Sequence, residues 1–152
     1  MSKNVSLSSL VSDPQHLAIA HGLAAAVGGE PDAFFGIKHN PSGKGEPLYT
    51  FTWIRGGVLG QAEVVNPGND DQWSSPGMSA CLRPLADVQK VDVGVDVTIP
   101  SGTTLDHSVK LKVKAHWPDK SGVILDATGS MDGNARPALE KLIALVLDRV
   151  DR

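Results

Sequence analysis

The chain has 152 residues, and its 14 Lys and Arg against 17 Asp and Glu leave a formal net charge of −3, with 41% hydrophobic residues. A chain of this composition can bury a core without disulfides or a structural metal, and it is not expected to be disordered. The slight excess of acidic residues argues against nucleic-acid binding. The single cysteine, Cys81, excludes an internal disulfide framework.

The first residues lack the pattern of a secretion signal. Met1-Ser2-Lys3-Asn4 carries one base and leads into a polar run from Ser6 to Ser12. The most apolar stretch, residues 17–27, is about half as long as a membrane-spanning helix. We therefore expect a cytoplasmic protein that does not insert into membranes.

The first half of the chain predicts a helix followed by antiparallel strands. Residues 1–11 form a polar lead-in to a single domain, residues 12–152. Asp13 and Pro14 are suited to begin a helix over 14–27, which Gly28-Gly29 ends. A strand is expected over 33–39, and residues 48–55 and 58–65 predict a hairpin turned by Gly56-Gly57. On the first hairpin strand, Tyr49, Phe51 and Trp53 point to one face, which we interpret as the core.

The second half predicts two long alternating strands, a shorter strand and a closing helix. A polar loop covers 66–77, and a strand over 78–83 breaks at Pro84. Valines then alternate with polar residues over 90–99, and apolar residues alternate with lysines over 109–116. Each run predicts a strand with one buried and one solvated face. A strand over 123–127 and an amphipathic helix from about 134 complete the chain.

The fold class that follows is α+β. We expect a strongly curved antiparallel sheet or half-barrel of about six or seven strands, with an N-terminal and a C-terminal helix. In the order of its elements, a meander closed by a C-terminal helix, the chain looks like a pleckstrin-homology-type barrel. This likeness of topology implies no particular function.

Charged residues on the two long strands have two interpretations. Lys110, Lys112, Lys114 and His116 share one strand face and could bind an anion, so Lys112 and Lys114 are candidate binding residues. When the strands are paired about their turn, Asp96 falls near Lys112 and Asp92 near His116. The row is then a cross-strand charge ladder that sets the register, which we favour.

Oxygen-bearing residues follow the strand over 123–125. Asp126-Ala127-Thr128-Gly129-Ser130-Met131 resembles the metal-ion-dependent adhesion motif of von Willebrand factor A domains. The resemblance implies a Mg²⁺ site with Asp126, Thr128 and Ser130 as ligands, and oxygen ligands suit that ion. Thr128 stands where that family has Ser, and the rest of that fold has no room after the motif. The alternative is a strand–helix junction whose polar residues turn the chain.

No pattern indicates an enzyme. Cys81 is expected to be a buried, inert thiol, and none of the five histidines lies in a catalytic or zinc-binding signature. We expect no catalytic residues and no cofactor.

Two tryptophans are candidate binding residues. Trp73 lies in the polar loop 66–77 and Trp117 beside a turn, where aromatic side chains often anchor partners. The leading hypothesis is a non-catalytic protein-interaction or self-association domain whose partner is another protein or a second copy. The alternatives are a small-ligand or enzymatic pocket in the concavity of the sheet and the Mg²⁺ site at 126–131.

Overall fold

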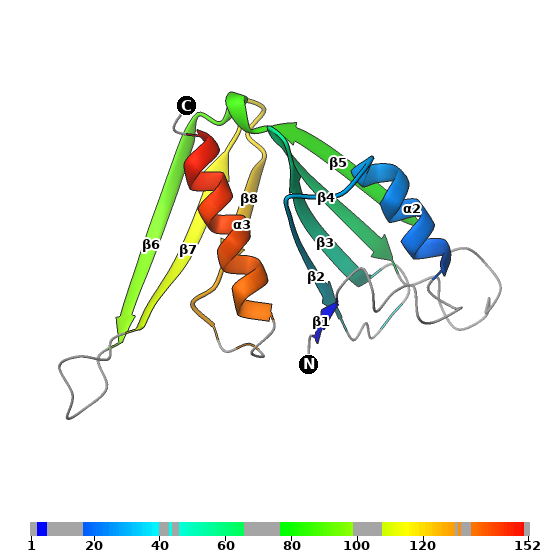
Figure 1. The fold of residues 1–152 in the computed structure, drawn as a ribbon, viewed down its shortest axis with the longest axis horizontal. Coiled ribbons are helices and arrows are strands. Elements are labelled where there is room, and N and C mark those ends of the chain that lie inside the picture. Colours follow the sequence, from blue (N-terminus) through cyan, green and yellow to red (C-terminus); the bar gives the residue numbers. More distant parts are fainter. Residues whose placement is uncertain are drawn as a thin grey trace. The chain divides into compact units, whose positions relative to one another are not determined.

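The computed structural model describes residues 3–5, 17–39, 43, 46–65, 77–98, 108–129, 131 and 135–150. The chain divides into two compact units, Met1–Pro84 and Leu85–Arg152 (Figure 1). The first unit contains β1 (Lys3–Val5), α2 (Leu17–Val27), β2 (Ala33–Lys38), β3 (Pro47–Arg55), β4 (Val58–Val65) and β5 (Met78–Pro84). The second contains the 3₁₀ turn η2 (Leu85–Asp87), β6 (Lys90–Thr98), β7 (Ser108–His116), β8 (Gly122–Asp126) and α3 (Ala135–Val150).

The first unit is an antiparallel meander in which the strands lie in chain order, β1-β2-β3-β4-β5. Its β3–β4 hairpin confirms the hairpin predicted from the sequence. Gly56 in the turn has φ 61°, a left-handed conformation that glycine adopts without strain. The strand β1 lies within the segment that the sequence indicates as a polar lead-in.

One face of this sheet packs against α2. Tyr49, Phe51 and Trp53 are all buried there, as the alternation of β3 predicts. Gly60 on β4 is directly opposite Trp53. A Cβ atom at Gly60 would lie 2.1 Å from Cε2 of the Trp53 ring. The indole therefore lies on a position that only glycine leaves open.

The second unit is a three-stranded antiparallel sheet, β6-β7-β8, with α3 on one face. The helix packs against η2, β7 and β8. Its apolar stripe, Leu139, Leu142, Ile143 and Val146, is buried, as the sequence predicts. The strand β6 forms an edge of this sheet (Figure 1).

The predicted α+β class, its antiparallel strands and its two terminal helices are confirmed. The strands form two sheets, where the sequence predicted one curved sheet or half-barrel: β5 ends at Pro84, η2 follows at once, and β6 begins the second sheet. In the described part of the chain neither sheet closes into a barrel. The C-terminal helix is therefore the feature that the chain shares with a pleckstrin-homology barrel.

The pairing of β6 with β7 differs from the predicted register by two residues. Asp96 lies opposite Lys110, where the sequence predicted Lys112, and Asp92 lies opposite Lys114. A shift of two residues keeps every side chain on its predicted face, because side chains alternate with a period of two. Residues 99–107 between these strands lie outside the described part of the chain, as do residues 14–16, where the first helix was expected to begin.

Among the described residues, no helix combines the length and apolar character needed to cross a membrane.

Candidate interaction surface

The most exposed apolar surface of the second unit lies on the β6–β7 hairpin. Val93, Val95 and Val97 on β6 and Val109 on β7, here called the hairpin valines, are between 47% and 59% exposed. The sequence predicted a buried face at these positions, and that prediction is wrong. A contiguous group of exposed apolar side chains is a common mark of a binding surface.

The position of α3 explains why the hairpin valines are exposed. Val113 and Ala115 on β7 and Val123 and Leu125 on β8 are buried on the face that the helix covers. Val93 lies directly opposite Val113, so the two side chains share that face. The burial therefore decreases from Val113, at 1% exposed, to its neighbour Val93, at 47%.

The strand β6 also presents a free edge. Within the described residues it pairs with β7 alone, so one side of its nine-residue backbone has no strand partner. Free edges of this length are sites where another strand can add to a sheet. Proteins often protect such edges with short strands, bulges, proline or charged side chains. The strand β6 pairs with β7 in continuous register from Lys90 to Thr98 and carries the charged residues Lys90, Asp92 and Asp96.

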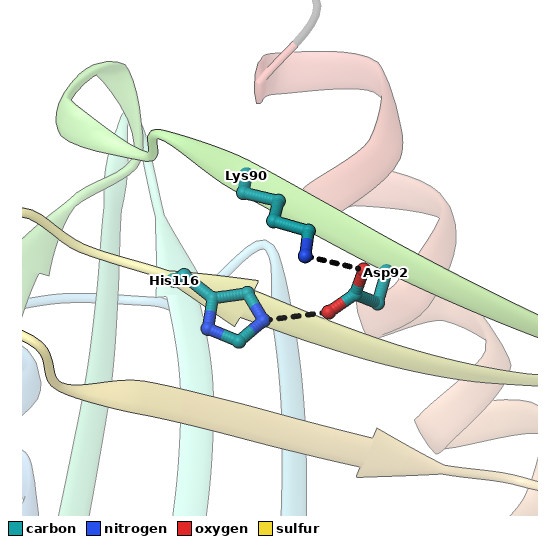
Figure 2. A network of polar contacts seen from close by, with 3 residues as sticks. All are labelled: Lys90, Asp92 and His116. Atoms are coloured by element: carbon teal, nitrogen blue, oxygen red, sulfur yellow. Dashed lines mark hydrogen bonds and ion pairs between the residues drawn. The ribbon is translucent and has the colours of Figure 1, made fainter.

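The opposite face of β6 carries a polar network (Figure 2). Nε2 of His116 lies 2.7 Å from Oδ2 of Asp92, and Nζ of Lys90 lies 3.4 Å from Oδ1 of the same carboxylate. The hydrogen bond with His116 lowers the pKa of Asp92 below its ordinary value of 3.8, and Lys90 adds to this effect. The predicted proximity of Asp92 and His116 is thus present.

The two candidate lysines of the anion-binding hypothesis have cross-strand neighbours. Lys112 Nζ lies 3.9 Å from Oδ2 of Asp126 on β8, and Lys114 lies between Asp92 and Ile124 in the register. Each lysine therefore has an acidic residue on an adjacent strand, which is the arrangement of a charge ladder.

The segment that resembles an adhesion motif forms a tight turn. Oδ1 of Asp126 accepts hydrogen bonds from the backbone nitrogen of Thr128 at 2.9 Å and from its hydroxyl at 2.5 Å. These bonds lower the pKa of Asp126. Arg136, in the first turn of α3, donates to the carbonyl oxygens of Ala127 and Gly129. The observed contacts are those of a strand–helix junction.

Two observations concern the metal-binding interpretation. Ser130, the third ligand that the resemblance implies, lies outside the described residues. Across the described ranges, no group of three or more His, Cys, Asp or Glu side chains is arranged to hold a metal ion.

A second candidate surface lies on the sheet of the first unit. An open depression of about 240 Å³ is bordered by the polar side chains Thr50, Gln61, Glu63, Ser79, Cys81 and Arg83 of β3, β4 and β5. Arg83 Nη1 donates to Oε1 of Gln61 at 3.2 Å.

Near this depression, Nε2 of His39 lies 2.9 Å from the hydroxyl oxygen of Thr50. Thr50 is directly opposite Glu63, which in turn is opposite Ser79. No local motif in the sequence joins the members of this row, because they come from four separate segments.

Two further side chains discussed from the sequence, Trp117 and Cys81, lie in different units. Trp117 is 5% exposed and belongs to the core of its unit, so little of its side chain is available to a partner. Trp73 lies outside the described residues. Cys81 is exposed on β5, which contradicts the expected buried thiol. Its strand is the last of the first sheet, so alternation alone did not determine its burial.

Comparison with known proteins gives no relative: no family model, no curated protein and no solved structure matches the chain.

Proposed function

We propose that this chain is a non-catalytic protein-interaction domain and that it binds another polypeptide through the β6–β7 hairpin. The observation that carries this proposal is the group of hairpin valines along the edge of a sheet. An added strand satisfies the free backbone groups of β6, and its side chains pack beside the valines of β6. Burial of apolar area stabilises such a complex by about 25 cal/mol per Å² before the costs of association.

The test compares two equally exposed positions of the same sheet. Val95 is 59% exposed on the apolar face, and Ile124 is 54% exposed on the polar face of β8. Val95→Lys places a charge in the proposed surface, whereas Ile124→Lys is the matched control. Both variants are expected to fold, because surface substitutions away from special features change stability little.

The measurement is chemical cross-linking of the tagged chain in the cells that produce it, together with a second, differently tagged copy. We expect the wild type and Ile124→Lys to capture at least one polypeptide that Val95→Lys does not capture. The second, differently tagged copy counts as such a polypeptide. Identical capture by all three chains would show that the hairpin is not the binding surface.

The depression on the first sheet supports a second candidate, binding of a small polar ligand. Glu63 and Arg83 place one carboxylate and one guanidinium at its border, a pair that suits a zwitterion such as a free amino acid. Thermal melting with each common amino acid at millimolar concentration tests this. A rise in melting temperature that Arg83→Ala abolishes supports it, and an unchanged temperature with every amino acid contradicts it.

The resemblance to the adhesion motif suggests Mg²⁺ binding at Asp126, Thr128 and Ser130, an interpretation that the contacts of Asp126 disfavour. Because Asp126 already accepts two hydrogen bonds from Thr128, we expect millimolar Mg²⁺ to leave the melting temperature unchanged. A rise that Asp126→Asn removes would restore the metal-binding hypothesis.

A further inference from the structure

We propose that the polypeptide bound by the hairpin is a second copy of this chain, whose β6 pairs antiparallel with β6 about a two-fold axis at Val93. This inference rests on the proposed function and specifies its partner. The two three-stranded sheets then form one sheet of six strands, in the order β8-β7-β6 followed by the partner's β6-β7-β8. The order of charges along β6 favours this register.

The two-fold axis at Val93 brings opposite charges together. It places Lys90 opposite the Asp96 of the second copy, and the symmetry repeats this pair. Asp92 lies opposite a glycine, Gly94, where it meets no like charge. Opposite charges on neighbouring strands each contribute roughly 0.2–1 kcal/mol, and like charges oppose pairing.

The proposed register also keeps the carboxylates of the two copies apart. Asp96 lies opposite Lys110 within its own copy. In the proposed register, the order across one row is Lys110, Asp96 and then the second copy's Lys90. The next row runs from Lys112 and Gly94 to the second copy's Asp92, which lies opposite its own Lys114. In both rows each carboxylate has a lysine or a glycine beside it and none faces another carboxylate, and the second copy's Lys90 lies opposite its own His116.

Other registers lack this property or pair too little of the strand, since an axis at Val91 pairs Lys90 with Asp92 but covers only residues 90–92 of β6. An axis at Gly94 pairs more of the strand, but it places Asp92 opposite Asp96 twice. Axes at Asp92 or at Asp96 place the same carboxylate against itself. An axis at Val95 avoids repulsion, yet it pairs Asp92 with Thr98 and Asp96 with Gly94, so it has no ion pair among the described residues of β6.

The apolar face agrees with the same register. Val93 meets the Val93 of the second copy, and Val91 meets Val95 on both sides of the axis. In an antiparallel pair related by such an axis, the same face of both sheets points the same way. The hairpin valines of both copies and both α3 helices therefore lie on one face of the joined sheet, and the association closes as a dimer.

Lys90 can take part in this contact while it remains near Asp92. Its side chain is 68% exposed in the ion pair with Asp92, and its ammonium group has three donors. His116 stays hydrogen bonded to the other oxygen of Asp92. The second copy's Asp96 can therefore accept from Lys90 while the network in Figure 2 persists.

Sedimentation analysis over micromolar to hundreds of micromolar concentrations tests the identity of the partner. We expect the wild type and Ile124→Lys to reach twice the 16.0 kDa of the monomer, and Val95→Lys to remain monomeric. A monomeric wild type at every concentration overturns the second copy as partner; capture of another protein that Val95→Lys prevents would then still support the proposed function. A dimer that Val95→Lys leaves intact overturns the proposed surface as well.

A charge exchange tests the register. Lys90→Glu and Asp96→Lys should each raise the dissociation constant of the dimer about tenfold or more, because each places two like-charge pairs in the interface. The double variant should restore part of the affinity, since it again places opposite charges at both pairs with their signs exchanged, while Asp96→Lys still faces Lys110 within each copy. Circular dichroism checks that each variant folds. Single variants without effect, or a double variant that is as weak as the worse single variant, overturn the register.

Cysteine cross-linking gives an independent readout in a Cys81→Ser background, because Cys81 is exposed. Directly opposed residues of an antiparallel pair lie at a distance that a disulfide can span. Val93→Cys should form a covalent dimer faster than Val95→Cys or Gly94→Cys. Faster reaction of Val95→Cys or Gly94→Cys would instead place the axis at that residue.

Discussion

The two sheets use the same alternation of side chains but differ in how their apolar faces are covered. In the first unit, α2 packs against the face that holds Tyr49, Phe51 and Trp53, and all three are buried. In the second unit, α3 covers β7 and β8, and the valines of β6 are about half exposed. A strand pattern therefore shows which side chains share a face, whereas the position of a helix decides whether that face is buried.

The first and largest test of this comparison removes apolar side chains from the two faces. Phe51→Ala should lower the free energy of unfolding by about 3–5 kcal/mol, because it leaves a cavity in a packed core. Val95→Ala should lower it by less than about 1 kcal/mol, since the side chain is already half solvated. Urea unfolding measures both, at a concentration where sedimentation shows only monomer.

Equal losses for these two variants would contradict the difference between the faces. A large loss for Val95→Ala would mean that the valine is buried in the isolated chain. A small loss for Phe51→Ala would mean that α2 does not pack against the first sheet.

A second test uses one glycine from each sheet. A Cβ at Gly60 would overlap the Trp53 ring at 2.1 Å, whereas a Cβ at Gly94 would lie 3.7 Å from Cβ of Lys112, an ordinary contact. Gly60→Ala should therefore lower the unfolding free energy by about 1–3 kcal/mol or more. Gly94→Ala should be neutral or stabilising by up to about 1 kcal/mol, because alanine loses less backbone entropy on folding.

Thermal and urea unfolding of the two alanine variants provide the measurement. Tryptophan fluorescence gives an additional readout, which should change for Gly60→Ala because the indole must move. Wild-type stability for Gly60→Ala would contradict the close packing of Trp53 on β4.

The smallest expected effect concerns the polar face of the second unit. Side chains on this face contact one another, whereas the hairpin valines on the apolar face are exposed. The pKa of Asp126 is lowered by its hydrogen bonds with Thr128. A carboxyl whose pKa is lower in the folded state contributes stability at pH values above its unfolded pKa. This contribution should be lost as the pH falls below about 3.8, through the lower folded value.

Carbon-13 titration of the Asp126 carboxyl measures this effect directly. Thr128→Ala removes the hydroxyl donor but keeps the backbone donor, so the pKa should rise part of the way toward 3.8. A wild-type pKa at or above that value would contradict the turn described here. Asp92 should show a shift of the same sign that His116→Ala reduces.

Much of the secondary structure was predictable from the sequence because it depends on local patterns. The alternation of Tyr49, Phe51 and Trp53 with threonines predicted a strand and its core face, and Gly56-Gly57 predicted the turn. The spacing of Leu139, Leu142 and Val146 predicted the closing helix and its buried stripe. Each of these signals lies within a few residues and needs no knowledge of distant segments.

The candidate surface was less predictable because it depends on distant parts of the chain. The sequence predicted that Val93, Val95 and Val97 share one face of the strand, which is correct. It also predicted that this face is buried, which is wrong. Their exposure depends on α3, about forty positions later in the chain, which packs on the two other strands of the sheet. The row of His39, Thr50, Glu63 and Ser79 likewise comes from four segments that only sheet pairing brings together.

The sequence by itself determined the periodicities, the turns and the sides of the strands, because these follow from the steric and polar properties of neighbouring residues. The tertiary structure decided the division into two sheets, the register of β6 on β7 and the valines that remain exposed. These properties depend on which segments of the chain pack against each other. The valines of β6 remain exposed because α3 packs against β7 and β8.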